Sequence, residues 1–307
     1  YPRDAYTITD KLTMFMLEKE EDMPGFFAGQ LERLGVDFLD YYWLHGLEAN
    51  SYPKAEALHA FDFVRKLKEE GKVRHIGFSF HGDAQMLEEI LTRYPYLEYV
   101  QIQLNYLDWE DAHVQSRLCY ETATRHHKPV IVMEPVKGGC LASIPEDAKE
   151  LLHRFHPDQS AASWAVRFAA SPENVMVVLS GMSDEAQMAD NLSYMKEFRP
   201  ITAQETDILN QAREIIQKSI AIPCTACRYC TDGCPKHIAI PDYFGFYNDL
   251  KRFGPSQMRN VRRRFKQLIE KNGKPSDCIK CGKCEERCPQ HLTIRKYLED
   301  VAGELEN

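Results

Sequence analysis

The sequence predicts an α/β protein: a (β/α)8 barrel of the TIM type that lacks two of its strand–helix units, followed by a small cysteine-rich helical domain. In residues 1–202, short apolar runs alternate with amphipathic helical segments, a pattern typical of a parallel sheet with helices on both faces. Polar residues gather where the apolar runs end. Eight of the ten cysteines then fall within residues 224–288, which indicates a second domain.

Six apolar runs are expected to form the strands. They span residues 6–12, 38–45, 74–81, 99–107, 129–136 and 174–181. Between them, segments such as 24–36 and 55–73 carry apolar side chains at helical spacing, and Gly71 stands where a helix commonly ends. Segments 83–94 and 183–198 begin with Asp or Ser residues of the kind that cap helices.

A closed barrel needs eight strand–helix units, whereas an open doubly wound sheet can stop at six. No glycine-rich dinucleotide fingerprint follows any of the six runs, which argues against the open sheet. A barrel places its active site at the carboxyl ends of its strands. Polar residues at those ends are Lys11, His45, Ser79, Gln101 or Asn105, Glu134 and Ser180. We therefore predict the barrel.

A helix is expected to begin at Thr202, and the composition then shifts towards Cys, Pro, Lys and Arg. We place the domain boundary here, with the barrel at 1–202 and the cysteine-rich domain at 203–307.

Two cysteine runs, 224–235 and 278–289, share the spacing CxxCxxCxxxCP. In this pattern the first three thiolates bind one iron–sulfur cubane, and the fourth, before the proline, binds the other. We therefore predict two [4Fe–4S] clusters. The expected ligand sets are Cys224, Cys227, Cys230 and Cys288 for the first cluster and Cys278, Cys281, Cys284 and Cys234 for the second. Zinc is the alternative, but its sites usually use two separated CxxC pairs.

Charge and hydropathy narrow the class of protein. The net charge is −8, with 46 acidic and 38 basic residues, which argues against a general nucleic-acid binder. No apolar run is long enough to span a bilayer, and the N-terminal residues do not read as a signal peptide. Because CxxC spacing suits metal sites better than disulfides, we expect the reducing cytoplasm as the compartment.

Residues 251–275 carry nine Lys or Arg against a single Glu. The simpler interpretation is a solvated helix face. The alternative is a docking patch for an acidic electron-transfer partner.

Six segments of the barrel region together resemble the aldo-keto reductases. They are YTITDKL, GVDFLDYYWLHGL, VRHIGFSFHG, VQIQLNYLD, VIVMEPVKGG and VVLSGMSDEAQMADNL. Followed by the doubled cysteine runs, they are similar to the branch of that family with a C-terminal ferredoxin-type 2[4Fe–4S] domain. The resemblance implies an NAD(P)H-dependent oxidoreductase that acts on a small carbonyl or related substrate.

The resemblance also implies catalytic residues. The family uses an Asp, Tyr, Lys, His tetrad, in which Tyr donates the proton, Lys lowers the pKa of Tyr and His orients the carbonyl. Lys11 and His45 match the last two. In the family the Asp and Tyr come before the Lys strand, so we expect them, with the two missing strand–helix units, to precede Tyr1. The alternative is a barrel remnant without a proton donor.

Dinucleotide contacts are implied as well. Ser79 and Gln101 match the residues that bind the nicotinamide carboxamide, Lys137 is a counter-charge for the pyrophosphate, and the last strand and its helix hold the adenosine phosphate. The full set is Ser79, Gln101, Pro135, Val136, Lys137, Gly138, Gly139, Gly181, Met182, Ser183, Gln187 and Asn191. Met133 replaces a stacking Tyr, and Gly181 replaces a Lys of many NADP-specific members, so both NADP(H) and NAD(H) stay open.

Hydride transfer to a carbonyl needs no iron. The clusters therefore favour a coupling of this chemistry to single-electron transfer with a redox partner. Two alternatives stay open: an electron carrier that uses the barrel as a docking scaffold, and clusters that only stabilise the C-terminal segment.

Overall fold

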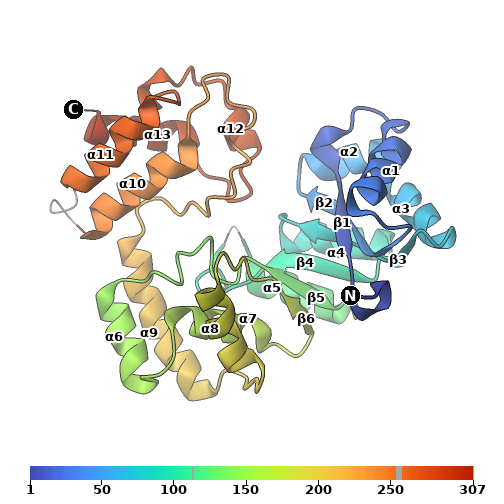
Figure 1. Ribbon diagram of the computed structural model, residues 1–307, viewed down its shortest axis with the longest axis horizontal. Coiled ribbons are helices and arrows are strands. Elements are labelled where there is room, and N and C mark those ends of the chain that lie inside the picture. Colours follow the sequence, from blue (N-terminus) through green and yellow to red (C-terminus); the bar gives the residue numbers. More distant parts are fainter. Residues whose placement is uncertain (113, 254–257, 307) are drawn as a thin grey trace. The chain divides into compact units, whose positions relative to one another are not determined.

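The computed structural model describes residues 1–112, 114–253 and 258–306 (Figure 1). The chain divides into two compact units. The first consists of Tyr1–Leu104, Asp108–Pro135 and Ala169–Gly181, and the second of Asn105–Leu107, Val136–Phe168 and Met182–Asn307. This division does not follow the expected domain boundary between residues 202 and 203, which stays a prediction. No helix in the described part of the chain is long and apolar enough to cross a membrane.

The first unit is built on a six-stranded parallel sheet (Figure 1). Its strands are β1 (Thr9–Thr13), β2 (Leu39–Leu47), β3 (Val73–Phe80), β4 (Tyr99–Gln103), β5 (Val130–Met133) and β6 (Val175–Val178). Each strand pairs with the next one along the chain. This is the strand order of a (β/α) barrel, as expected, and β1 and β6 are the end strands of the sheet among the described residues.

Helices separate the strands of the first unit. They are α1 (Asp22–Leu34), α2 (Ser51–Ala57), α3 (Ala60–Glu69), α4 (Ala84–Arg93) and α5 (Ser116–Arg125), with short 3-10 helices at Arg3–Ala5 and Met14–Met16. Asp83 caps α4, because its side chain accepts a hydrogen bond from the Met86 backbone. Gly71, at a φ of 72°, follows the end of α3 as expected.

Several expectations about element boundaries were wrong. The runs expected to begin at residue 6 and to end at residues 136 and 181 form strands that begin at Thr9 and end at Met133 and Val178. Segment 55–73 is two helices and not one, because His59 adopts a left-handed φ of 53° between α2 and α3. The fourth strand ends at Gln103 instead of residue 107. There the Leu107 backbone N–H donates to the side chain of Asn105 at 3.1 Å, and such a local bond competes with strand pairing.

The core of the first unit lies on the buried strands. All five residues of β4 are buried, as are the last five of β3. Strands buried in this way read as continuous apolar runs, which is why the sequence signal for them was strong.

The second unit is helical. Its helices are α6 (Glu146–Phe155), most of α7 (Ala161–Ala170), α8 (Glu185–Met195), α9 (Ala203–Ser219), α10 (Ile240–Phe253), α11 (Met258–Ile269), α12 (Lys283–Glu286) and α13 (Ile294–Leu305), with a 3-10 helix at Pro275–Asp277. Helix α6 lies alongside α9 (Figure 1), and their apolar faces pack around Trp164. Helix α9 begins with a capping box at Thr202, where its start was expected.

A buried ion pair joins α7 to α9. Arg167 Nη1 lies 2.8 Å from Glu205 Oε1, and the Glu205 side chain is 3% exposed. His156 Nε2 lies 3.0 Å from the same oxygen. Burial opposes ionisation of Glu205, but the hydrogen bonds from Arg167 and from Thr202 outweigh it and lower the pKa of Glu205 to about 2. The carboxylate is therefore charged at neutral pH.

We predict that Glu205→Gln destabilises the protein by about 3–5 kcal/mol at neutral pH, because it leaves a buried guanidinium without its counter-charge. The stabilisation by Glu205 is present above the ordinary carboxyl pKa of 4.5 and is lost as the pH falls towards 2. Urea unfolding followed by circular dichroism measures both effects. Glu214→Gln, on the exposed face of the same helix, is the control and should change stability by about 0.5 kcal/mol or less; equal effects of the two variants would contradict the prediction.

Candidate functional site

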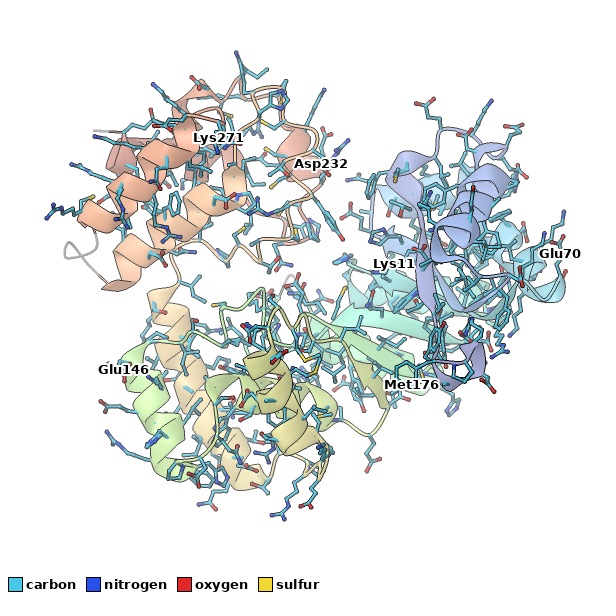
Figure 2. All side chains as sticks on the ribbon, in the orientation of Figure 1. Lys11, Glu70, Glu146, Met176, Asp232 and Lys271 are labelled. Atoms are coloured by element: carbon cyan, nitrogen blue, oxygen red, sulfur yellow. The ribbon has the colours of Figure 1, made fainter. Side chains whose placement is uncertain are left out.

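The pairing of β1 with β2 brings the two expected catalytic residues close together. Lys11, labelled in Figure 2, is opposite Trp43, and its Nζ lies 5.3 Å from the centre of the Trp43 ring. Two residues further on, Thr13 is opposite His45. Thr13 Oγ1 and His45 Nδ1 are 3.3 Å apart. Lys11 and His45 therefore lie on adjacent strands, close enough for the charge of Lys11 to affect the pKa of His45.

The surroundings change the pKa of both groups. Burial lowers the pKa of the Lys11 ammonium, and the neighbouring Asp10 carboxylate partly opposes this shift. Burial, and then the positive charge of Lys11, lower the pKa of His45 to about 4. At neutral pH the imidazole is therefore neutral beside a cation, so it can donate a hydrogen bond without carrying charge.

Ser79 and Gln101 face one another across β3 and β4, because they are register partners. Each is 1% exposed. Ser79 Oγ accepts a hydrogen bond from the Gly46 backbone at 2.7 Å. Gln101 Oε1 is buried and has no hydrogen-bond partner among the described residues. A buried amide oxygen without a partner is costly, so a ligand N–H at this position would be favoured.

The expected pyrophosphate loop has an unusual backbone. Pro135 ends one stretch of the first unit, and the residues that follow it belong to the second unit. Lys137, Gly138 and Gly139 all adopt left-handed φ values of 47°, 60° and 90°. The Lys137 side chain is 4% exposed. Consecutive left-handed residues are strained when they are not glycine, and such strain is concentrated at functional sites.

The expected adenosine-phosphate residues lie at the start of α8 and are mostly exposed. Asp184, and not Ser183, caps this helix, because its side chain accepts from the Gln187 backbone at 2.8 Å. The Ser183 N–H donates to Gln187 Oε1 at 2.7 Å. One amide expected to bind an anion is therefore bonded within the turn. Tyr194 Oη donates to Asn191 Oδ1, Met182 is exposed, and Gly181 has open space where a side chain would begin.

The structure brings the thiols of the first expected ligand set together. Cys230 is buried, and its pKa is raised by that burial and by the nearby thiols of Cys224, Cys227 and Cys288. The Ala226 N–H donates to Cys224 Sγ at 3.4 Å. Backbone N–H bonds to cysteine sulfur are a feature of iron–sulfur sites.

The second expected set lines one cavity in the helical unit, together with apolar side chains such as Ile238 and Leu298. The four cysteines around the cavity are Cys234, Cys278, Cys281 and Cys284. Burial raises the pKa of the Cys284 thiol to about 11. In the described part of the chain, no three His, Cys, Asp or Glu side chains converge closely enough to hold one metal ion. The thiols surround a space instead, which fits a cluster whose irons each take one thiolate.

The two cysteine runs share their backbone conformation beyond the cysteines. Residues with left-handed φ correspond in pairs: Ala226 with Lys280, Arg228 with Gly282, and His237 with His291. The His237 and His291 N–H groups donate to the carbonyls of Cys234 and Cys288, both at 3.0 Å. The two histidines were not among the expected site residues, although the repeated CPKH and CPQH sequences mark them.

We predict that Cys284→Ser lowers the iron content of anaerobically purified protein by about half, because it removes an expected ligand of one of the two clusters that the cysteine spacing predicts. Iron and acid-labile sulfide analysis measures this. Cys119→Ala, which changes a buried cysteine of the first unit, is the control and should keep the full content. Colourless protein that contains zinc and no sulfide would contradict the prediction.

Burial of His45 should make the stability of the protein depend on pH. Unfolded histidine takes up a proton near pH 6.5, whereas folded His45 does so only near pH 4. Stability should therefore fall as the pH drops from 6.5 to 4. His45→Gln should lose this part of the pH dependence and keep the rest, as measured by urea unfolding at several pH values. Parallel pH profiles of the variant and the parent protein would contradict the shift.

Comparisons with known proteins agree with this geometry. A model of the aldo/keto reductase family matches residues 2–214, and a model of the 4Fe-4S dicluster domain matches residues 223–293. No curated protein matches the chain.

Several solved structures share the fold. Aldo-keto reductase AKR11C1 from Bacillus halodurans is 23% identical, with 69% of this chain and 73% of that chain covered and a TM-score of 0.54. The thermostable aldo-keto reductase Tm1743 is 18% identical, with 69% and 73% covered and a TM-score of 0.55. An aldo-keto reductase from Klebsiella pneumoniae in complex with NADPH is 16% identical, with 68% and 70% covered and a TM-score of 0.51.

Proposed function

Because the chain belongs to the aldo/keto reductase family and carries a 4Fe-4S dicluster domain, we propose that it reduces a small carbonyl compound with NADP(H) or NAD(H) and holds two [4Fe–4S] clusters. The observation that carries the proposal is the placement of Lys11 beside His45 on adjacent strands, with the pKa of both lowered. A buried cation next to a neutral imidazole suits a site where a carbonyl oxygen takes up a proton.

In this proposal the bound dinucleotide supplies the hydride, and the chain's own residues handle the oxygen of the substrate. The neutral His45 donates a hydrogen bond to the carbonyl oxygen and orients it. The proton comes from the tyrosine that the family uses as donor, and Lys11 stabilises the anion left on that tyrosine, which lowers the pKa of the tyrosine towards the working pH. The lowered pKa of Lys11 itself reflects a poorly solvated site, where the electrostatic effect of an ammonium is stronger than in water.

Gln101 and Ser79 are proposed to bind the nicotinamide carboxamide. The buried Gln101 Oε1 without a partner would accept from the carboxamide N–H, and the Ser79 hydroxyl can still donate while it accepts from Gly46. Residues 135–139 would contact the pyrophosphate, and residues 181–191 the adenosine phosphate. The Klebsiella pneumoniae structure in complex with NADPH supports NADP(H), whereas Gly181 in place of a lysine is compatible with NAD(H).

We further propose that the clusters exchange single electrons with an acidic protein partner at α11. Val261 and Phe265 of this helix are buried. The next residues along the helix, Arg262 and Lys266, line a surface hollow with Lys274, and Phe265 and Glu306 also border it. Such a cationic surface speeds association with an acidic partner. Within the basic segment 251–275, residues 254–257 lie outside the described part of the chain.

Lys11→Met is expected to lower carbonyl-dependent NADPH oxidation by at least about 100-fold, because the cation that stabilises the proton donor's anion is lost. Lys128→Met is the matched control. Lys128 also has a pKa lowered by burial, but it donates to the Pro95 carbonyl and should leave the activity nearly unchanged. Iron content should stay the same in both variants. Equal rates of Lys11→Met and the parent protein would remove Lys11 from the site.

A further inference from the structure

The glycine loop, defined here as residues 136–140, touches the first cysteine run. A Cβ on Gly138 would lie 2.2 Å from the carbonyl oxygen of Thr225, the residue after Cys224. Both segments belong to the second compact unit. At a φ of 60° and with this approach, only glycine fits at position 138. Gly139 differs, because a Cβ there would meet nothing within 4 Å.

Both partners of this contact are held in place from their other sides. In the glycine loop, the N–H groups of Gly139 and Leu141 donate to the Val136 carbonyl, at 3.0 and 3.1 Å, and Leu141 is fully buried. Just before the cysteine run, the Asn248 side chain accepts from the Ile222 N–H at 2.8 Å and donates to its carbonyl at 2.7 Å. Neither loop can move at the contact without disturbing the other.

Thr225 is itself part of the cluster-binding segment. It is 5% exposed, and its Oγ1 has no hydrogen-bond partner among the described residues. The next residue, Ala226, donates its N–H to Cys224 Sγ. A sulfur-rich group held by Cys224 and Cys227 would supply acceptors for donors of this segment. The conformation of residues 224–227 therefore depends on what their thiols bind.

We propose that the glycine loop couples dinucleotide binding to the first cluster: the cluster held through Cys224, Cys227 and Cys230 fixes Thr225, and Thr225 fixes the glycine loop through Gly138. The proposal rests on the proposed function, because it takes the glycine loop as the pyrophosphate loop. Coupling between two sites is reciprocal. A cluster that orders the loop for the dinucleotide must then be stabilised in turn by the bound dinucleotide.

The first test uses the unmodified, cluster-loaded chain. Iron release to a strong chelator is followed with and without saturating NADP⁺, which donates no electrons, and NADP⁺ binding is measured separately by calorimetry. We expect NADP⁺ to slow the release of part of the iron by about 5- to 100-fold. Binding without any slowing would overturn the coupling and leave the proposed function standing. Absence of binding would overturn both.

The second test compares Gly138→Ala with Gly139→Ala. Both replace a glycine of left-handed φ, where any side chain is strained, but only the first places a Cβ against Thr225. Gly138→Ala should release iron faster than the parent protein and lose the protection by NADP⁺. Gly139→Ala should release its iron, measured without NADP⁺, at the rate of the parent protein. The same rate of iron release from both variants would contradict a coupling that passes through the contact of Gly138 with Thr225. If Gly138→Ala fails to fold, the chelator experiment on the unmodified chain still tests the coupling.

Discussion

The in-register parallel pairing of neighbouring strands is the interaction on which the first unit depends. Thr13 stands opposite His45, and Ser79 stands opposite Gln101. Side chains alternate between the two faces of a strand, so a slip of one residue would turn each of these groups to the other face. The positions of the polar groups in the site are therefore fixed by the same strand pairing that the apolar residues stabilise. Lys11 helps to lower the pKa of His45 only because this register is kept.

The second unit depends on a different constraint, because several cysteine side chains pack against or within its apolar core. Cys230 and Cys288 are buried in the same cluster as Tyr243, Phe244 and Leu298. Because the pKa of Cys230 is raised, its thiol stays protonated until metal binding displaces the proton. Because cluster assembly needs thiolates, it is linked to pH and to folding of the surrounding helices. Folding of the helical unit and metal loading of its thiols are thus physically connected.

Much of the fold and of the cluster region could be predicted from the sequence, because the signals are local. A buried parallel strand appears in the sequence as a run of apolar residues. The four cysteines of each run lie within a dozen residues of one another, at a spacing typical of iron–sulfur ligands. The break at His59 was missed because it depends on a left-handed φ at a residue other than glycine. The early end of β4 was missed because it depends on a hydrogen bond between a backbone N–H and a side chain. The contact of Gly138 with Thr225 joins residues far apart in the chain, and no local pattern predicts such a contact.

Deuterium labelling shows whether a hydride passes directly from the dinucleotide to the substrate. Cluster-loaded protein is incubated with a carbonyl compound that it reduces and with NADPH carrying deuterium at C4 of the nicotinamide, and the alcohol product is examined by mass spectrometry. The proposed roles of Lys11 and His45 predict deuterium on the carbinol carbon, because the hydride moves directly from dinucleotide to substrate. Product formed without deuterium from either face of the nicotinamide would contradict hydride transfer and point to electron transfer through the clusters.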